Sequence, residues 1–140
     1  MAVTRYLLDT GAMGDLINHR RNVDVRAREA RRKGARIGTC IPVVGELFFG
    51  IEASASRDKN LPRLIRALSR TICWPFERRA AEEYGRLAAE LKRTGRPMQQ
   101  IYIQIGAIAL SLGNCTVVSS DSDLKAIPGL NVEDWAERSE

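Results

Sequence analysis

Hydrophobic residues occur along this chain in two patterns, short continuous runs and longer stretches that repeat every three to four positions. The short runs are typical of buried strands, and the longer stretches are typical of helices with one apolar face. The strand-like runs are Arg5–Leu8, Ile37–Val43, Thr71–Trp74, Cys115–Ser119 and Leu130–Val132. The helical stretches are Ala12–Arg20, Val23–Lys33, Val44–Ser56, a segment expected to be capped by Asn60, Glu77–Thr94 and Gln99–Leu112.

Strands that alternate with helices predict a parallel sheet covered by helices on both faces. We therefore expect an α/β fold, a three-layer α/β/α sandwich around a central, mostly parallel sheet of four to five strands. The 140 residues suffice for one domain and are too few for two, and no linker or repeat interrupts them. Residues 1–140 are thus expected to form a single domain, with functional side chains gathered beyond the carboxyl ends of its strands.

Composition narrows the possible classes of function. No apolar run approaches the ~18 residues of a membrane span, and the first charged residues come too early for a secretory signal. The three cysteines are odd in number and far apart, so we expect reduced thiols and a cytoplasmic protein. One histidine and no close cysteine pair argue against zinc. The expected metal, if any, is a hard cation held by carboxylates.

Acidic residues follow the predicted strands at the positions where chemistry is expected. Asp9 ends the first strand, and Asp121 and Asp123 follow the fourth. Glu46 lies one turn into the helix after the second strand. We expect these carboxylates to meet at one edge of the sheet, where Mg²⁺ or Mn²⁺ would relieve their repulsion. Such an ion can also activate water for attack on a phosphate.

Each acid also has a purely structural interpretation that stays open. Asp9 could serve only as a turn or helix cap, and one of Asp121 and Asp123 could cap the helical turn at Leu124. Glu46 could be a first-turn acid that the helix dipole favours. The shared location of these residues, rather than any one of them, favours a site.

Positive charge is concentrated in one segment of the chain. The net charge is +5, yet residues 20–36 alone hold eight basic and two acidic residues, so the remainder is close to neutral. A run of this kind is most often a solvated helix face. The alternative is a surface that contacts the phosphate backbone of a nucleic acid, with the expected contacts Arg26, Arg28, Arg31 and Arg32.

Taken in order, several short motifs resemble the PIN-domain ribonucleases, and within them the VapC-type toxins of toxin–antitoxin pairs. The matching blocks run from residue 5 to residue 135 in the family's order and spacing, so they cover nearly the whole chain. They are Tyr6-Leu7-Leu8-Asp9-Thr10, Gly45-Glu46-Leu47 with Gly50-Ile51-Glu52, Gly95-Arg96-Pro97, residues 117–124, Ile127-Pro128-Gly129-Leu130 and Glu133-Asp134-Trp135. No single block is specific, but the ordered set is.

The resemblance implies a PIN-like fold and a metal-dependent endoribonuclease toxin that cleaves RNA phosphodiester bonds with Mg²⁺ or Mn²⁺. Carried over by position, Asp9, Glu46 and Asp121 are the implied metal-site acids, and Asp123 is an auxiliary catalytic residue. The resemblance further implies a homodimer and a cognate VapB-type antitoxin that wraps the toxin and blocks its acidic pocket. Structured RNA such as tRNA is the implied substrate class.

One position departs from the family pattern. The family places its third metal-site acid near the start of the helix after Gly95-Arg96-Pro97, and that position here is Tyr102. A phenol is neutral at pH 7 and is a poor Mg²⁺ ligand. Three accounts stay open: a natural non-catalytic protein, an active protein in which the other three acids suffice, or an inactivating change. We favour the last, because Asp and Tyr codons can differ by a single base.

Two other functions stay open at this point. A non-catalytic PIN-like protein would bind antitoxin or RNA without cleavage, and Tyr102 is the feature that favours it. A phosphotransferase-like α/β domain would use Asp9 as its nucleophile. It ranks last, because such enzymes usually carry a second Asp two residues later, and position 11 is Gly.

Overall fold

Five short strands form one sheet in which every neighbouring pair is parallel. They lie in the order β3-β2-β1-β4-β5. The strands are β1 (Arg5–Leu8), β2 (Arg36–Cys40), β3 (Ile72–Trp74), β4 (Cys115–Val118) and β5 (Asn131–Glu133). This computed structural model describes residues 2–138, so the two ends of the expected 1–140 domain lie outside the described residues.

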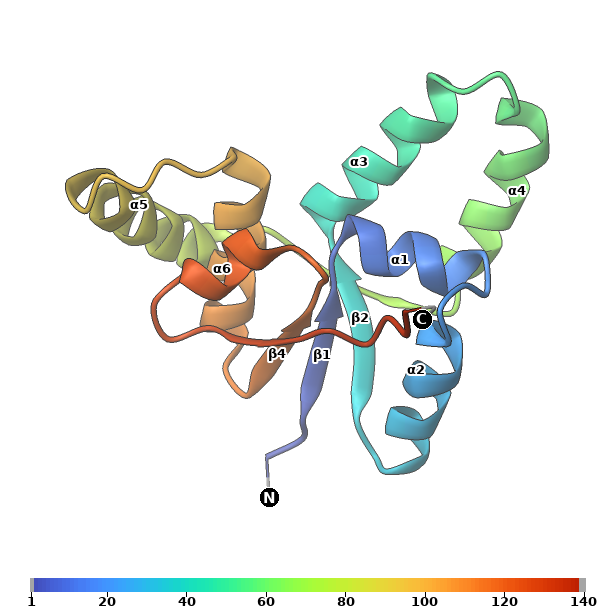
Figure 1. The fold of residues 1–140 in the computed structure, drawn as a ribbon, viewed down its shortest axis with the longest axis horizontal. Coiled ribbons are helices and arrows are strands. Elements are labelled where there is room, and N and C mark those ends of the chain that lie inside the picture. The colour runs from blue at the N-terminus through green and yellow to red at the C-terminus, as the bar shows by residue number, and fades with distance from the viewer. Residues whose placement is uncertain (1, 139–140) are drawn as a thin grey trace.

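Helices cover both faces of this sheet, which confirms the expected α/β/α sandwich (Figure 1). The connections that lead from β1 through β2 to β3 carry α1 to α4 on one face, and α5 and α6 cover the other. The helices are α1 (Thr10–Ile17), α2 (Val23–Arg32), α3 (Ile41–Glu52), α4 (Arg57–Leu68), α5 (Arg78–Arg93) and α6 (Gln100–Leu112). A short 3₁₀ helix, η1 (Ser122–Ala126), connects β4 to β5.

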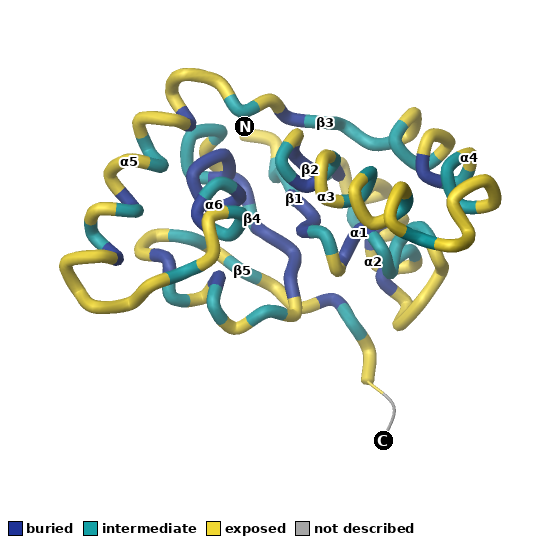
Figure 2. Tube along the Cα trace, turned by 90° about the horizontal axis from the view of Figure 1, so that it is seen from above, coloured by how far each residue is buried: buried dark blue, intermediate teal, exposed yellow. Residues whose placement is uncertain are grey.

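The chain leaves β1 toward one edge of the sheet and leaves β4 toward the other. A switch point of this kind opens a crevice beyond the carboxyl ends of the two strands, and ligands of open α/β sheets bind there. Here that crevice lies between β1 and β4, whose residues Leu7, Leu8, Val117 and Val118 are buried in the core. Figure 2 shows the same concentration of burial in β1, β4 and α6.

Several predicted element boundaries were wrong. The helix expected over Val44–Ser56 is Ile41–Glu52, and the helix expected over Ala12–Arg20 is Thr10–Ile17. The strand expected to run to Val43 ends at Cys40, because Pro42 lies in the first turn of α3, where its missing N–H costs no hydrogen bond. The helix expected to be capped by Asn60 begins at Arg57 instead. The carbonyl oxygen of Ser56 accepts hydrogen bonds from the backbone N–H groups of Lys59 and Asn60, which closes the first turn of α4 earlier.

The segment after β5 packs back across the start of the sheet. Trp135 is 3% exposed, and its ring centroid lies 4.9 Å from that of Tyr6 in β1. The guanidinium carbon of Arg26 in α2 lies 5.7 Å from the Trp135 ring centroid, within the range of a cation–π contact. Trp135 therefore links the end of the chain to β1 and α2.

The helices and the cysteines bear on the expected class of protein. Within residues 2–138, no helix is both long enough and apolar enough to cross a bilayer. The three cysteines, Cys40, Cys73 and Cys115, are all free thiols, and burial raises the pKa of Cys40 and of Cys115 to about 12. At neutral pH these thiols are therefore protonated and behave as packing residues.

Substitution of Gly38 tests the close approach of β2 to β3. A Cβ atom at this position would lie 2.7 Å from the carbonyl oxygen of Ile72 and 2.7 Å from the Trp74 ring. We expect Gly38→Ala to lower the free energy of unfolding by about 1–3 kcal/mol, measured by urea denaturation. The matched control is Gly85→Ala in α5, where nothing lies within 4 Å of the added atom. It should leave stability unchanged or raise it by about 0.5–1 kcal/mol, and equal effects of the two variants would contradict this packing.

Candidate active site

The site forms where β1 and β4 end side by side. Leu8 is paired with Val118, so Asp9 and Ser119, the next residues of the two strands, are neighbours at the switch point. The backbone N–H of Asp9 donates to the carbonyl oxygen of Val118 at 3.1 Å. Ser119 Oγ donates to Asp9 Oδ2 at 2.5 Å. Asp9 is only 6% exposed and Ser119 only 1%, so the structure holds this carboxyl in the protein interior.

Asp9 also caps the helix that follows it. Its Oδ1 accepts a hydrogen bond from the backbone N–H of Ala12 at 2.8 Å, so Asp9 is the N-cap of α1, which does not exclude a further role. Burial raises the pKa of Asp9, and the hydrogen bonds from Ser119 and Ala12 oppose the increase without cancelling it. The negative charge of nearby Asp121 raises the pKa further. Asp9 is therefore a cap whose ionised form is disfavoured, a condition common among groups that work in active sites.

Asp121 belongs to the same hydrogen-bonded group. Its backbone N–H donates to Ser119 Oγ at 2.9 Å, so the Ser119 hydroxyl joins the two acids. Its Oδ1 caps η1 by accepting from the backbone N–H of Asp123 at 2.9 Å. We call the connected side chains of Asp9, Ser119, Asp121 and Tyr102 the acid site.

Tyr102 reaches the acid site from α6 and takes up the remaining oxygen of Asp121. Tyr102 Oη donates to Asp121 Oδ2 at 2.5 Å. This hydrogen bond lowers the pKa of Asp121, and with burial it raises the pKa of Tyr102 to about 12. The phenol is therefore protonated throughout the neutral range, and it stabilises the Asp121 carboxylate as a neutral donor.

The other two predicted acids lie at the margins of the acid site. Glu46 is exposed on α3, and its Oε1 accepts a hydrogen bond from Thr10 Oγ1 at 2.6 Å. Asp123 Oδ1 forms an ion pair with Arg96 at 3.6 Å. The structure thus brings Asp9 and Asp121 together through Ser119, whereas Glu46 and Asp123 have other partners.

The acid site offers the type of ligand that a divalent cation prefers, but too few such ligands. Carboxylate oxygens suit Mg²⁺ and Mn²⁺. However, across the described part of the chain, no three His, Cys, Asp or Glu side chains converge on one point where an ion could be held. Tyr102 also occupies an oxygen of Asp121 that an ion would need. In this arrangement the acids do not form a metal cage, so metal binding stays a prediction.

The structure separates the four arginines that were predicted to contact RNA. Arg28 and Arg31 line a pocket between α2 and α4. Arg26 instead lies over the Trp135 ring, and Arg32 is exposed near the end of α2. The predicted RNA contacts therefore do not form one continuous face, and their role in binding RNA stays a prediction.

Sequence reasoning did not assign a role to Ser119 or Thr10, which hold the predicted acids in place. Ser119 lies at the end of an apolar strand. The available signal in the sequence is this small polar residue, at a strand end expected to lie beside an acid. Thr10 directly follows Asp9, but its contact with Glu46 depends on how α1 and α3 pack. A strand end can be located from the sequence, whereas the packing of two helices cannot.

Comparison with known proteins agrees with this fold. Residues 6–130 match the PIN domain family, so the chain belongs to that family. The tRNA(fMet)-specific endonuclease VapC of Shigella flexneri is 28% identical over 132 residues, which cover 94% of this chain and 98% of the relative. The protein of the same name from Salmonella typhimurium is 32% identical over 90 residues, which cover 64% and 68% of the two chains.

A solved structure extends the similarity to three dimensions. One chain in the crystal structure of VapBC2 from Rickettsia felis, bound to a DNA fragment from its promoter, superimposes with a TM-score of 0.86. The two chains are 28% identical, and the match covers 94% of this chain and 99% of the other. Within the PIN-domain family, the chain is therefore of the VapC type.

Replacing Ser119 tests whether its hydroxyl stabilises the buried Asp9 carboxylate. We expect Ser119→Ala to lower the free energy of unfolding at pH 7 by about 1–3 kcal/mol, because a buried acceptor loses a donor. The loss should shrink as the pH falls through the raised pKa of Asp9, since the neutral carboxyl needs the donor less. Urea denaturation over a pH series measures both effects.

The matched control is Ser120→Ala, which removes an exposed hydroxyl that donates to Asp134. Its effect should stay within about 0.5 kcal/mol at every pH. If Ser119→Ala costs no more than this control, the Ser119 hydroxyl does not stabilise Asp9.

Proposed function

We propose that this chain is an endoribonuclease toxin of a VapBC-type toxin–antitoxin pair, and that Tyr102 holds it in a state of low activity. The observation that carries the proposal is the buried Asp9 carboxyl at the switch point, joined to Asp121 through Ser119. Relatives that match over 94% of the chain are named tRNA(fMet)-specific endonuclease and ribonuclease, which makes tRNA the proposed substrate class. The cytoplasm is the proposed location, where the free thiols stay reduced.

The proposed cofactor is Mg²⁺ or Mn²⁺, held by Asp9, Glu46 and Asp121. When bound, such an ion would neutralise charge at the phosphate and make water a stronger nucleophile. The burial of Asp9 supports this proposal, because burial disfavours the ionised carboxylate and a bound cation would offset that cost. Asp123, beside the acid site and paired with Arg96, is the proposed auxiliary residue.

Tyr102 opposes this role in two ways. Its hydroxyl occupies Asp121 Oδ2, and its neutral ring stands where the family resemblance implies a third carboxylate. The site therefore lacks one negative charge, and an oxygen of a remaining acid is engaged. Both effects weaken the attraction for a divalent cation, which is why we propose low activity rather than a different reaction.

The Tyr102→Asp variant tests the proposed function. We expect this variant to cleave a tRNA(fMet) transcript with Mg²⁺ or Mn²⁺ at least 10–100-fold faster than the unchanged chain, roughly the range that supporting groups contribute at metal sites. Cleavage is measured by gel electrophoresis of end-labelled RNA. Adding EDTA, or combining the variant with Asp9→Asn, should abolish it.

Tyr102→Phe is the matched control, because it removes the hydrogen bond to Asp121 and keeps the ring. Phe should leave cleavage far below that of the Asp variant, since no carboxylate is restored. If neither the unchanged chain nor Tyr102→Asp cleaves RNA with either ion, the ribonuclease proposal is wrong. The non-catalytic alternative, which the Tyr102–Asp121 hydrogen bond favours, would then be supported by RNA or antitoxin binding without cleavage.

The proposed protein partner is a cognate VapB-type antitoxin. A groove of about 410 Å³ between α1, α3 and α4 is lined in part by Thr10 and Glu46. A segment of antitoxin in this groove would cover Glu46 and so block one side of the acid site. Neighbours such as the Rickettsia felis protein were solved as VapBC assemblies, which supports this partner. A homodimer is proposed as well, on the family resemblance alone.

A further inference from the structure

Five arginines from two separate helices line one pocket on the face of the sheet that α1 to α4 cover. α2 contributes Arg28 and Arg31, and α4 with the turn after it contributes Arg63, Arg66 and Arg70. The pocket holds about 420 Å³. Four of the five side chains are exposed, so they can be reached from solvent.

These arginines are not neutralised within the described structure. None of the five forms an ion pair with a carboxylate of residues 2–138, whereas Arg57 and Arg86 each pair with a glutamate at 2.7 Å. The single acid that lines the pocket, Asp24, is bonded to His19 Nδ1 at 2.9 Å. Like charges gathered in this way repel one another, and a bound anion would relieve the repulsion.

Neutral acceptors orient two of the guanidinium groups without cancelling their charge. Arg63 Nη2 donates to Asn18 Oδ1 at 3.0 Å, and Arg31 Nη2 donates to the carbonyl oxygen of Arg70 at 3.4 Å. Both groups keep further N–H donors free, because a guanidinium has five. The planar arrangement of these donors matches two oxygens of a phosphate.

The arginine pocket adjoins the groove that leads to the acid site. The two cavities share Ile17 and Arg63 as lining residues, and the groove also reaches Thr10 and Glu46. A polymer with a phosphate at every unit can therefore lie in the pocket and extend along α1 toward the acids. The acids themselves repel phosphates, so an attachment point elsewhere is needed to hold such a polymer.

We propose that the arginine pocket between α2 and α4 binds the sugar-phosphate backbone of the RNA. The identity of the polyanion rests on the proposed ribonuclease function, while the site rests on the clustered, unpaired arginines. The proposed RNA surface differs in part from the set of α2 arginines that the sequence predicted. Arg28 and Arg31 belong to it, Arg63, Arg66 and Arg70 join it, and Arg26 and Arg32 lie outside it.

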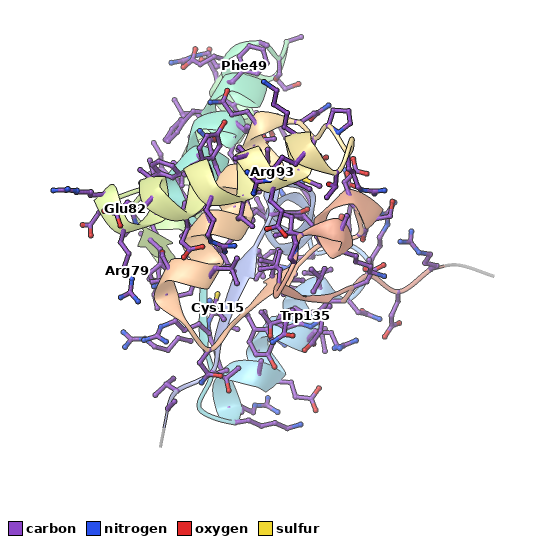
Figure 3. All side chains as sticks on the ribbon, turned by 90° about the vertical axis from the view of Figure 1, so that its left-hand side faces the viewer. Phe49, Arg79, Glu82, Arg93, Cys115 and Trp135 are labelled. Atoms are coloured by element: carbon purple, nitrogen blue, oxygen red, sulfur yellow. The ribbon has the colours of Figure 1, made fainter. Side chains whose placement is uncertain are left out.

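The test compares two triple variants with the same change in charge. The pocket variant is Arg28→Gln, Arg66→Gln and Arg70→Gln, all at exposed positions. The control variant is Arg79→Gln, Lys92→Gln and Arg93→Gln, also exposed, on α5 at the opposite side of the sheet (Figure 1). Figure 3 shows Arg79 and Arg93 on this outer helix. Circular dichroism melting checks that both variants are folded.

Binding is measured by fluorescence anisotropy of a labelled tRNA(fMet) transcript from 50 to 200 mM salt, with EDTA present so that no RNA is cut. We expect the pocket variant to bind at least about tenfold more weakly at low salt. The slope of log affinity against log salt should fall by about 2 to 3, since three phosphate contacts are lost. The control variant should lose less than about threefold, through general charge alone.

Two results would overturn the proposal. One is equal loss in the pocket and control variants, which would make the effect one of net charge. The other is tRNA affinity that the pocket variant retains in full, as expected if the pocket takes an acidic segment of a partner protein instead. Because EDTA prevents cleavage, this outcome is independent of the Tyr102→Asp experiment. Loss of binding in the pocket variant together with no cleavage by Tyr102→Asp would leave an RNA-binding pocket on a non-catalytic protein.

Discussion

The acid site depends on one constraint, the burial of a carboxyl group at the end of the central strand pair. The backbone pairing of β1 with β4 determines the neighbours of Asp9, because Leu8 and Val118 are held in register. A buried acid is costly unless donors reach it. The Ser119 hydroxyl and the Ala12 amide supply two, yet burial still raises the pKa of Asp9. A neighbouring positive charge would therefore stabilise the ionised form of the buried Asp9 carboxyl.

The remaining oxygens of the acid site are engaged within the chain itself. Asp121 accepts from the Asp123 amide and from Tyr102, so both of its oxygens have donors. A third carboxylate at position 102 would add repulsion to the two acids, whereas the phenol adds a hydrogen bond. Under the metal role proposed above, the same contacts that stabilise the site would lower its affinity for the ion.

The sequence was sufficient to predict the sheet and the pairing of its central acids. Short apolar runs located all five strands, and parallel strands bring their carboxyl ends to one edge, which placed Asp9 beside the β4 end. Features that depend on how helices pack were not predictable. The Tyr102 hydroxyl reaches Asp121 only because of the position of α6. Likewise, the Glu46 carboxylate accepts a hydrogen bond from Thr10 because of how α1 and α3 pack. Residues of both α2 and α4 line the arginine pocket, so the sequence of either helix alone does not predict it.

The two edges of the sheet limit how this protein can assemble. Strands β3 and β5 lie at the edges and have only three residues each, so they present few unpaired peptide groups to another chain. Most of the exposed large apolar side chains in the described residues lie on helices instead. Ile65 in α4 is 54% exposed, and Phe49 in α3 is 74% exposed (Figure 3). Short edge strands thus disfavour growth of the sheet by added strands, and the exposed apolar side chains favour contacts through helix surfaces.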